Sequence, residues 1–320
     1  MLTVLEVTLP VFGLVICGFI GSWLRMLPDK AVDGINAFVF WFALPAMLFR
    51  VIGLQPVAQL VEPHFILAWV CAGLSVFFTV AWLAMAGGVD RADRSAGQST
   101  AFALTAAHGN VGYLGLGLVA ELGKQWLPTI ALAILCDIFV IITLGLILLE
   151  LQTKPGPTHV WAIVRKIASG LLKSPLVVSI CVGLLFSLSE LRLPVAIDNF
   201  SRILGNAAGP CALFAIGASL GGQTVSTDRA VWVLCLFKLL VHPLMAALYL
   251  FVVFKLPPDI AAIGVIAAAL PAASNTFIIS QRYGMKTLSI SSSILLGTFV
   301  AIVTVSATVW ILGLQPDFRP

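Results

Sequence analysis

Long stretches without charged side chains alternate with short charged clusters along almost the whole chain. Most of these stretches approach or exceed the roughly 20 residues that a helix needs to cross about 30 Å of hydrocarbon. Eight of them contain no Asp, Glu, Lys or Arg: residues 7–24, 34–49, 65–89, 95–120, 174–189, 203–227, 260–281 and 287–316. The pattern therefore predicts eight membrane-spanning segments without a charged residue.

Two further apolar stretches each contain one charged residue. Asp137 lies alone within residues 125–149, and Lys238 lies alone within residues 230–254, with His242 nearby. Because lipid offers no partner to open backbone groups, spanning segments must be helices or closed barrels, and the strict alternation of a barrel is absent. The sequence thus predicts an all-α integral membrane protein with ten transmembrane helices.

Composition and charge support this class. The 320 residues are 60% hydrophobic and 10% charged, with a mean hydropathy of +1.07, which excludes an ordinary soluble domain. With the N-terminus outside, 11 Lys and Arg fall on the cytoplasmic side and 6 outside, so both termini are expected outside the cytoplasmic membrane. The net charge of +4 is then a sign of topology, and no nucleic-acid partner is expected. The surrounding lipid is the expected partner.

An offset of 165 residues relates the two halves of the chain. Pro10 maps to Pro175, Pro45 to Pro210 and Asn110 to Asn275. Each half holds five spans, an odd number, so the second copy enters the membrane from the opposite side. The sequence therefore predicts two inverted five-helix repeats, residues 1–153 and 174–320, joined by a cytoplasmic linker, residues 154–173, that contains a basic interfacial helix.

The fourth and ninth spans carry helix-weakening residues at matching places. Glycines recur through residues 108–117, and Pro271 interrupts the ninth span just before Asn275. Interrupted spans at matching positions of two repeats are typical of a transporter's binding site. The predicted substrate-binding residues are Gly109, Asn110, Gly112, Tyr113, Pro271, Ser274 and Asn275. The structural alternative is that the glycines allow close helix packing and each asparagine bonds a neighbouring helix.

Ionisable residues inside spans are the other candidates, since a charge in the membrane is costly and often functional. Asp137 could carry a coupling proton or bind Na⁺, or it could be a structural partner of Lys238. His108, at the break in the fourth span, could handle a proton or contact substrate, or bond a freed carbonyl. Lys238 and His242, four residues apart on one helix face, could supply positive potential for an anion.

Three motifs resemble the auxin efflux carrier family, which includes bacterial malonate and malate permeases. They are residues 110–115 (Asn-Val-Gly-Tyr-Leu-Gly), residues 44–49 (Leu-Pro-Ala-Met-Leu-Phe) and the run from Leu270-Pro271 to Tyr283-Gly284. The resemblance implies ten helices in two inverted repeats, similar to the bile-acid symporter and sodium/proton antiporter folds. It also implies crossed, broken fourth and ninth helices around an organic anion. Gly117 and Ser174 depart from the family's usual Pro and Asn.

These observations predict a secondary transporter that moves a small carboxylate by alternating access. An ion-coupled symporter and a monovalent cation/proton antiporter of the same fold stay open, as does a membrane sensor outside transport. No enzyme is expected, because no paired nucleophile and base is visible, and no Cys/His cluster has metal-ligand spacing. The sequence indicates no cofactor beyond a coupling H⁺ or Na⁺, and it leaves a homodimer open.

Overall fold

The computed structural model describes residues 2–28, 30–55, 62–153, 165, 169–170, 172–189, 191, 193–221 and 225–313. The predicted basic interfacial helix in the linker lies almost wholly outside these residues, as do both extreme ends of the chain. Within the described ranges all regular structure is helical, apart from one isolated antiparallel bridge between Gly109 and Ala272.

The helices of the first half follow one another with few long loops. They are α1 (Leu2–Trp23), α2 (Ala31–Phe38), η1 (Val39–Ala43), α3 (Leu44–Gly53), α5 (Pro63–Met85), α6 (Ala96–Ala107), η2 (Val111–Gly115), α7 (Leu116–Leu122), η3 (Lys124–Trp126), α8 (Leu127–Cys136), η4 (Asp137–Ile142) and α9 (Thr143–Thr153). All of these η segments are π-helical except η3, which is a 3₁₀ turn.

The second half has the same character. Its helices are α11 (Pro175–Leu188), α12 (Val195–Asn206), α13 (Ala208–Leu220), α14 (Arg229–Leu236), η5 (Phe237–Val241), α15 (His242–Ala247), η6 (Leu248–Val253), α16 (Pro258–Ala269), α17 (Asn275–Arg282) and α18 (Leu288–Ile311). Both η5 and η6 are π-helical.

In the part of the chain that the structure describes, six continuous helical stretches are long and apolar enough to span a membrane. They are Ala31–Gly53, Pro63–Met85, Lys124–Gln152, Val195–Leu220, Arg229–Val253 and Leu288–Ile311. The other predicted spans fall on shorter apolar helices, which are Leu9–Trp23, Val111–Leu122, Pro175–Leu188 and Pro258–Ala269. Large apolar side chains such as Trp82 and Val303 lie exposed on the outside, as expected for a surface in contact with lipid.

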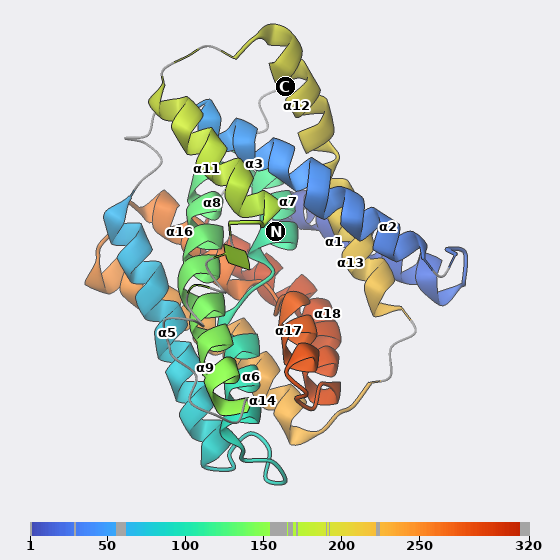
Figure 1. Ribbon diagram of the computed structural model, residues 1–320, viewed down its shortest axis with the longest axis vertical. Coiled ribbons are helices and arrows are strands. Elements are labelled where there is room, and N and C mark those ends of the chain that lie inside the picture. The colour runs from blue at the N-terminus through green and yellow to red at the C-terminus, as the bar shows by residue number, and fades with distance from the viewer. Residues whose placement is uncertain are drawn as a thin grey trace.

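The helices pack as two bundles, which Figure 1 shows as an upper and a lower group. In the first bundle α1 packs against α13, and α3 packs against both α11 and α12. In the second, α5 packs on α6, α15 on α16 and α14 on α18, while α8 and α9 contact α16 and α6. We call these the α1–α13 bundle (α1–α3, η1 and α11–α13) and the α6–α16 bundle (α5–α9 and α14–α18, with their η segments).

Helices α6 and α16 form the centre of the second bundle. Every residue of α6 from Gly97 to Ala107 and every residue of α16 from Ala261 to Ala269 is buried. Small side chains dominate both helices, so neighbouring backbones can approach closely where lipid gives no hydrophobic drive for packing. Both helices end deep in the protein, and the candidate site lies at these two ends.

Candidate functional site

Two non-helical segments meet between the ends of α6 and α16. The first, residues 108–110, separates α6 from η2, and the second, residues 270–274, separates α16 from α17. The Asn110 N–H donates to the Pro271 carbonyl at 2.8 Å, and the Ala273 N–H donates to the His108 carbonyl at 3.2 Å. Each segment therefore satisfies backbone groups that the other's interrupted helix leaves open.

Local sequence explains why the chain turns here. Pro271 has no N–H to continue a helix, and Leu270 before it adopts an extended conformation (φ −63°, ψ 149°), as residues before proline prefer. On the other segment, a Cβ on Gly109 would come within 3.0 Å of Lys238 Nζ. Glycine thus allows the close approach of the Lys238 ammonium to this backbone.

A buried polar network lies directly behind the first segment. Asp137, at the start of η4, is 2% exposed and receives two hydrogen bonds. Trp69 Nε1 donates to Asp137 Oδ1 at 2.8 Å, and His108 Nδ1 lies 2.9 Å from Asp137 Oδ2. The far side of the His108 ring, Nε2, lies 3.2 Å from Asn275 Nδ2. The network therefore runs from α5 through the interior to the first residue of α17.

Lys238 forms a second buried group, within η5. Its ammonium donates to the Ala268 carbonyl at 2.7 Å and lies 2.8 Å from His242 Nδ1. The carbonyl belongs to the last turn of α16, where the negative end of the helix dipole favours a cation. Asp137 bonds Trp69 and His108 instead, and the described residues show no direct ion pair between Lys238 and Asp137.

A cavity of about 690 Å³ opens beside the meeting point of the two segments. Its size is within the usual range for small-ligand sites. Eight of the residues expected at a substrate or coupling site line it: His108, Gly109, Asn110, Gly112, Tyr113, Asp137, Ser274 and Asn275. Pro271 belongs to the backbone contact between the two segments, while Lys238 and His242 lie buried and do not line the cavity.

Sequence reasoning missed several residues at this site. Trp69 bonds Asp137, and its signal was an indole N–H inside a span, a donor that needs a partner when buried. The opposite wall of the cavity comes from α2 and η1, through Asp33, Asn36, Phe40 and Trp41. Nothing in the local sequence of that wall indicated that it faces the two interrupted helices, because the contact joins distant segments.

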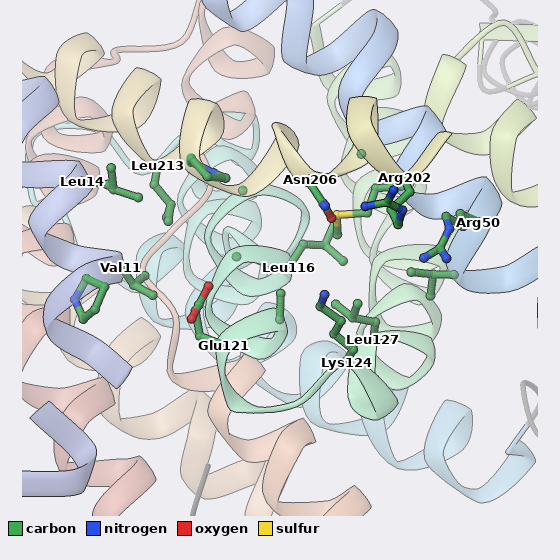
Figure 2. Close-up of a pocket in the computed structure, with 18 of the residues that line it drawn as sticks. Val11, Leu14, Arg50, Leu116, Glu121, Lys124, Leu127, Arg202, Asn206 and Leu213 are labelled. Carbon is green, nitrogen blue, oxygen red and sulfur yellow. The ribbon is translucent and has the colours of Figure 1, made fainter. Parts of the chain in front are cut away.

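A second cavity, of about 550 Å³, lies between α1, α3, α7, α12 and α13. Figure 2 shows Arg50, Lys124 and Arg202 on one side of it and Glu121, from α7, on another. Arg50 Nε bonds Asp198 Oδ1 at 2.6 Å, and Arg202 donates to Asn199 at 3.2 Å. The distribution of basic residues predicts that these three cations lie on the outside of the membrane, so we call this second cavity the outer cavity.

Comparisons with known proteins agree with this architecture. A model of the family described as "Membrane transport protein" matches residues 3–311. A protein of Rhizobium meliloti (strain 1021) named "Putative malonate transporter" is 28% identical in an alignment 320 positions long that covers 98% of each chain. The "Lysosomal cholesterol signaling protein" of Mus musculus is 24% identical in an alignment 319 positions long that covers 94% of this chain and 36% of the mouse protein.

Proposed function

This chain belongs to the membrane transport protein family, that of the auxin efflux carriers, and we propose that it carries a small carboxylate across the cytoplasmic membrane by alternating access. Family membership makes it a multi-pass membrane protein and a transporter, not an enzyme. The resemblance found in the sequence motifs is thereby confirmed. The substrate, its coupling ion and the inverted fold are our proposals.

The observation that carries the proposal is the cavity at the two interrupted helices. Asn110 and Asn275 both line it, one before η2 and the other at the start of α17. Helix starts present unpaired N–H groups and partial positive charge, and an asparagine amide adds two donors. A carboxylate would find donors from both halves of the chain at one point, without a full positive charge that would hold it too tightly for release.

The malonate in the name of the Rhizobium meliloti relative favours a short dicarboxylate as the substrate to test first. The 690 Å³ cavity leaves room for such an anion together with bound water. Lys238 lies buried behind Gly109, outside the cavity lining, and its positive potential would favour an anion over a cation in this site.

The residues that line the two cavities support an inverted repeat. Six residues that line one of the two cavities each have a counterpart, 165 positions later in the chain, that lines the other cavity. The pairs are Val11 with Leu176, Asn36 with Ser201, Ala37 with Arg202, Phe40 with Gly205, Trp41 with Asn206 and Val51 with Ile216. We propose that the two cavities are equivalent halves of one pathway, open to opposite sides of the membrane.

The two bundles suggest what moves. Both cavities lie where the α1–α13 bundle faces the α6–α16 bundle, and the candidate site belongs mainly to the latter. We propose that the α6–α16 bundle shifts against the α1–α13 bundle, closing one cavity as the other opens, so that the broken, crossed helices carry the anion with them.

Asp137 and His108 are the proposed coupling residues. They form a buried hydrogen-bonded pair that lines the cavity. A proton or Na⁺ bound there would change the hydrogen bond between His108 and Asn275. A cation/proton antiporter would need no anion at the asparagines, and uptake of labelled anion separates the two functions.

The test is uptake of radiolabelled malonate and related carboxylates into proteoliposomes under imposed proton or sodium gradients. Asn110→Ala removes donors to a charged group, worth about 1.5–3 kcal/mol, so the half-saturating malonate concentration should rise roughly 10- to 150-fold. Gln281→Ala, a truncation of an exposed amide side chain at the end of α17 that lines neither cavity, is the matched control and should transport normally. Unchanged half-saturation in Asn110→Ala would show that the substrate site lies elsewhere.

A second variant addresses coupling. Asp137→Asn keeps the size of the side chain and removes its charge, so the gradient dependence of uptake should disappear. If this variant accumulates substrate against its gradient as wild type does, Asp137 has a structural role only.

A further inference from the structure

The His108 ring lies between the buried Asp137 carboxylate and the cavity. Its two hydrogen-bond partners indicate which ring nitrogen carries the hydrogen. An amide nitrogen can only donate, so in the 3.2 Å contact with Asn275 Nδ2 the His108 Nε2 must accept. The hydrogen of a neutral ring then lies on Nδ1, which donates to Asp137 Oδ2 at 2.9 Å. The geometry therefore fits a neutral His108 ring that donates to Asp137 and accepts from the Asn275 amide.

This arrangement decides which end of the Asn275 amide faces the cavity. Asn275 lines the cavity and is exposed to it, and its NH₂ group is directed at His108. Its carbonyl oxygen accepts no hydrogen bond from the described residues. A carbonyl oxygen carries partial negative charge, so this state of the site offers an acceptor where a carboxylate needs a donor.

A proton on His108 would reverse the amide. Both ring nitrogens of an imidazolium donate, so Nε2 would require an acceptor, and the only acceptor on Asn275 within reach is its carbonyl oxygen. The terminal torsion of asparagine is broad and roughly two-fold, so a half-turn about it exchanges oxygen and nitrogen at small cost. The NH₂ group would then face the cavity.

We propose that His108 is a proton-operated selector, which makes Asn275 present a donor to a carboxylate only when the ring is protonated. This inference rests on the proposed function and adds its coupling chemistry. The anion and the proton bind cooperatively, because each favours the same orientation of one amide. Without a proton the oxygen faces the anion and weakens its binding.

The charged and titratable groups around His108 are compatible with this role. Asp137 on η4 accepts from the ring and stabilises an imidazolium, while Trp69 on α5 holds that carboxylate in place. Lys238 on η5 lies behind Gly109, with His242 on α15 at 2.8 Å from its ammonium, and a charge on Lys238 opposes a second cation nearby. Cys136 precedes Asp137, and the cavity wall adds two more titratable groups, Asp33 on α2 and Tyr113 on η2. The pair of Asp137 and protonated His108 is neutral overall, which lowers the cost of charging the ring inside the membrane.

Proton uptake on binding tests the selector. Purified protein in detergent is titrated with malonate by calorimetry in buffers of different ionisation enthalpy near neutral pH. Wild type should take up a proton with each malonate, and its dissociation constant should fall by up to about tenfold per unit decrease in pH. His108→Gln, which keeps an amide partner for Asn275 but does not titrate, should lose this uptake. The difference between the two isolates the protein's proton from any taken up by malonate itself.

Two further variants locate the effect. Asn275→Ala keeps the His108 ring but removes the amide, so malonate binding should no longer take up a proton through the protein. His64→Gln changes an exposed histidine at the start of α5 and should behave as wild type. Undiminished uptake in His108→Gln or Asn275→Ala would overturn the proposal, and loss of uptake in Asp137→Asn alone would assign the proton to the carboxylate instead.

A measurement without ligand keeps this inference separate from the proposed function. Nitrogen-15 NMR of histidine-labelled protein distinguishes the two neutral tautomers, and the His108 signals are assigned by their loss in His108→Gln. The Nδ1–H tautomer is expected, and an Nε2–H tautomer would refute the selector. Failure of every carboxylate to bind would instead refute the proposed function, and the tautomer would still decide the inference about His108.

Discussion

Asp137 illustrates how the protein holds a carboxylate inside a membrane segment. Both of its oxygens have a donor, the Trp69 indole and the His108 ring, and the residue is 2% exposed. A buried ionised group without such donors would be very costly, since desolvation of a charge far exceeds that of a neutral polar group. The donors come from α5 and from the segment after α6, so three separate parts of the chain are linked at one residue.

Removal of the Trp69 indole N–H should therefore lower the free energy of unfolding measurably. Trp69→Phe keeps most of the ring and removes the N–H, so Asp137 loses one of two donors, at a cost of roughly 1.5–3 kcal/mol in the free energy of unfolding. Unfolding in mixed micelles measures this. Trp82→Phe, on the exposed face of the same helix, is the control and should change the free energy little. The same Trp69→Phe change made in an Asp137→Ala background, where the N–H has no carboxylate to bond, should cost less; an equal cost there would show that ring size, not the N–H, matters.

At the scale of elements, the closest packing joins α1 to α13. A Cβ on Gly18 would overlap the Phe214 carbonyl, and one on Gly217 would overlap the Val15 carbonyl, so each glycine faces the backbone of the other helix. No flexible side chain can move aside at either point. The two glycines set the distance between a helix of the first half and one of the second.

Gly217→Ala should separate these helices. Overpacking against backbone costs on the order of 3 kcal/mol or more, which exceeds the roughly 1 kcal/mol that alanine gains over glycine in a helix. Thermal unfolding of purified protein in detergent should show a lower midpoint for Gly217→Ala and Gly18→Ala. Gly13 lies on α1, as Gly18 does, but a Cβ there would meet open space, so Gly13→Ala should be neutral or stabilising. An unchanged midpoint in Gly217→Ala would argue against this crossing.

A second element-scale contact is the start of α14, where Asp228 is the N-cap. Its carboxylate accepts from the Val231 N–H at 3.0 Å and from the Ser289 hydroxyl, at the start of α18, at 2.6 Å. Burial raises the pKa of this carboxyl. The hydrogen bonds from the Ser289 hydroxyl and the Val231 N–H together lower it by more, so the pKa lies below its ordinary value. The charged form is thus favoured in the folded protein.

Asp228→Ala should lower stability by about 1 kcal/mol at neutral pH, the usual worth of an N-cap. A carboxyl with a depressed folded pKa stabilises above its unfolded pKa, near 3.9, and loses this as pH falls through the folded value. The difference between wild type and Asp228→Ala should therefore shrink as the pH is lowered below about 4. Asp228→Asn keeps an N-cap acceptor but has no carboxyl to protonate, so its stability relative to Asp228→Ala should not depend on pH. If the difference between wild type and Asp228→Ala also stays constant with pH, the carboxylate is not its source.

The positions of the helices could be predicted from the sequence, but their partners could not. Charge-free stretches of membrane length mark helices because lipid excludes both charge and open backbone. Pro271 and the glycines near His108 likewise indicated where helices end. The Trp69–Asp137 bond spans 68 residues and the Arg50–Asp198 bond 148, and no local pattern encodes such pairs. Asp198 lies in the first turn of α12 and bonds Arg50 of α3.

At the scale of the whole molecule, the two cavities lie on the same surface between the bundles, and six pairs of their lining residues are 165 positions apart. Inverted repeats reach two states by exchanging the conformations of their halves, so equivalent residues should be exposed to opposite sides of the membrane. Ala37 and Arg202 form such a pair, since they differ by 165 positions, line different cavities and are both exposed. Their accessibility from each side is a direct test of inversion.

Single cysteines at these positions should react from opposite sides. In a background with the six native cysteines replaced, a membrane-impermeant maleimide should label Arg202→Cys in right-side-out vesicles and Ala37→Cys in inside-out vesicles, because the basic residues place Arg202 outside. Saturating malonate should change both labelling rates, since one bundle shift closes one cavity as it opens the other. The cysteine-free parent gives the background. Labelling of both positions from the same side would contradict inverted halves, whereas opposite sides with the reverse assignment would keep the inversion and overturn the predicted orientation of the termini.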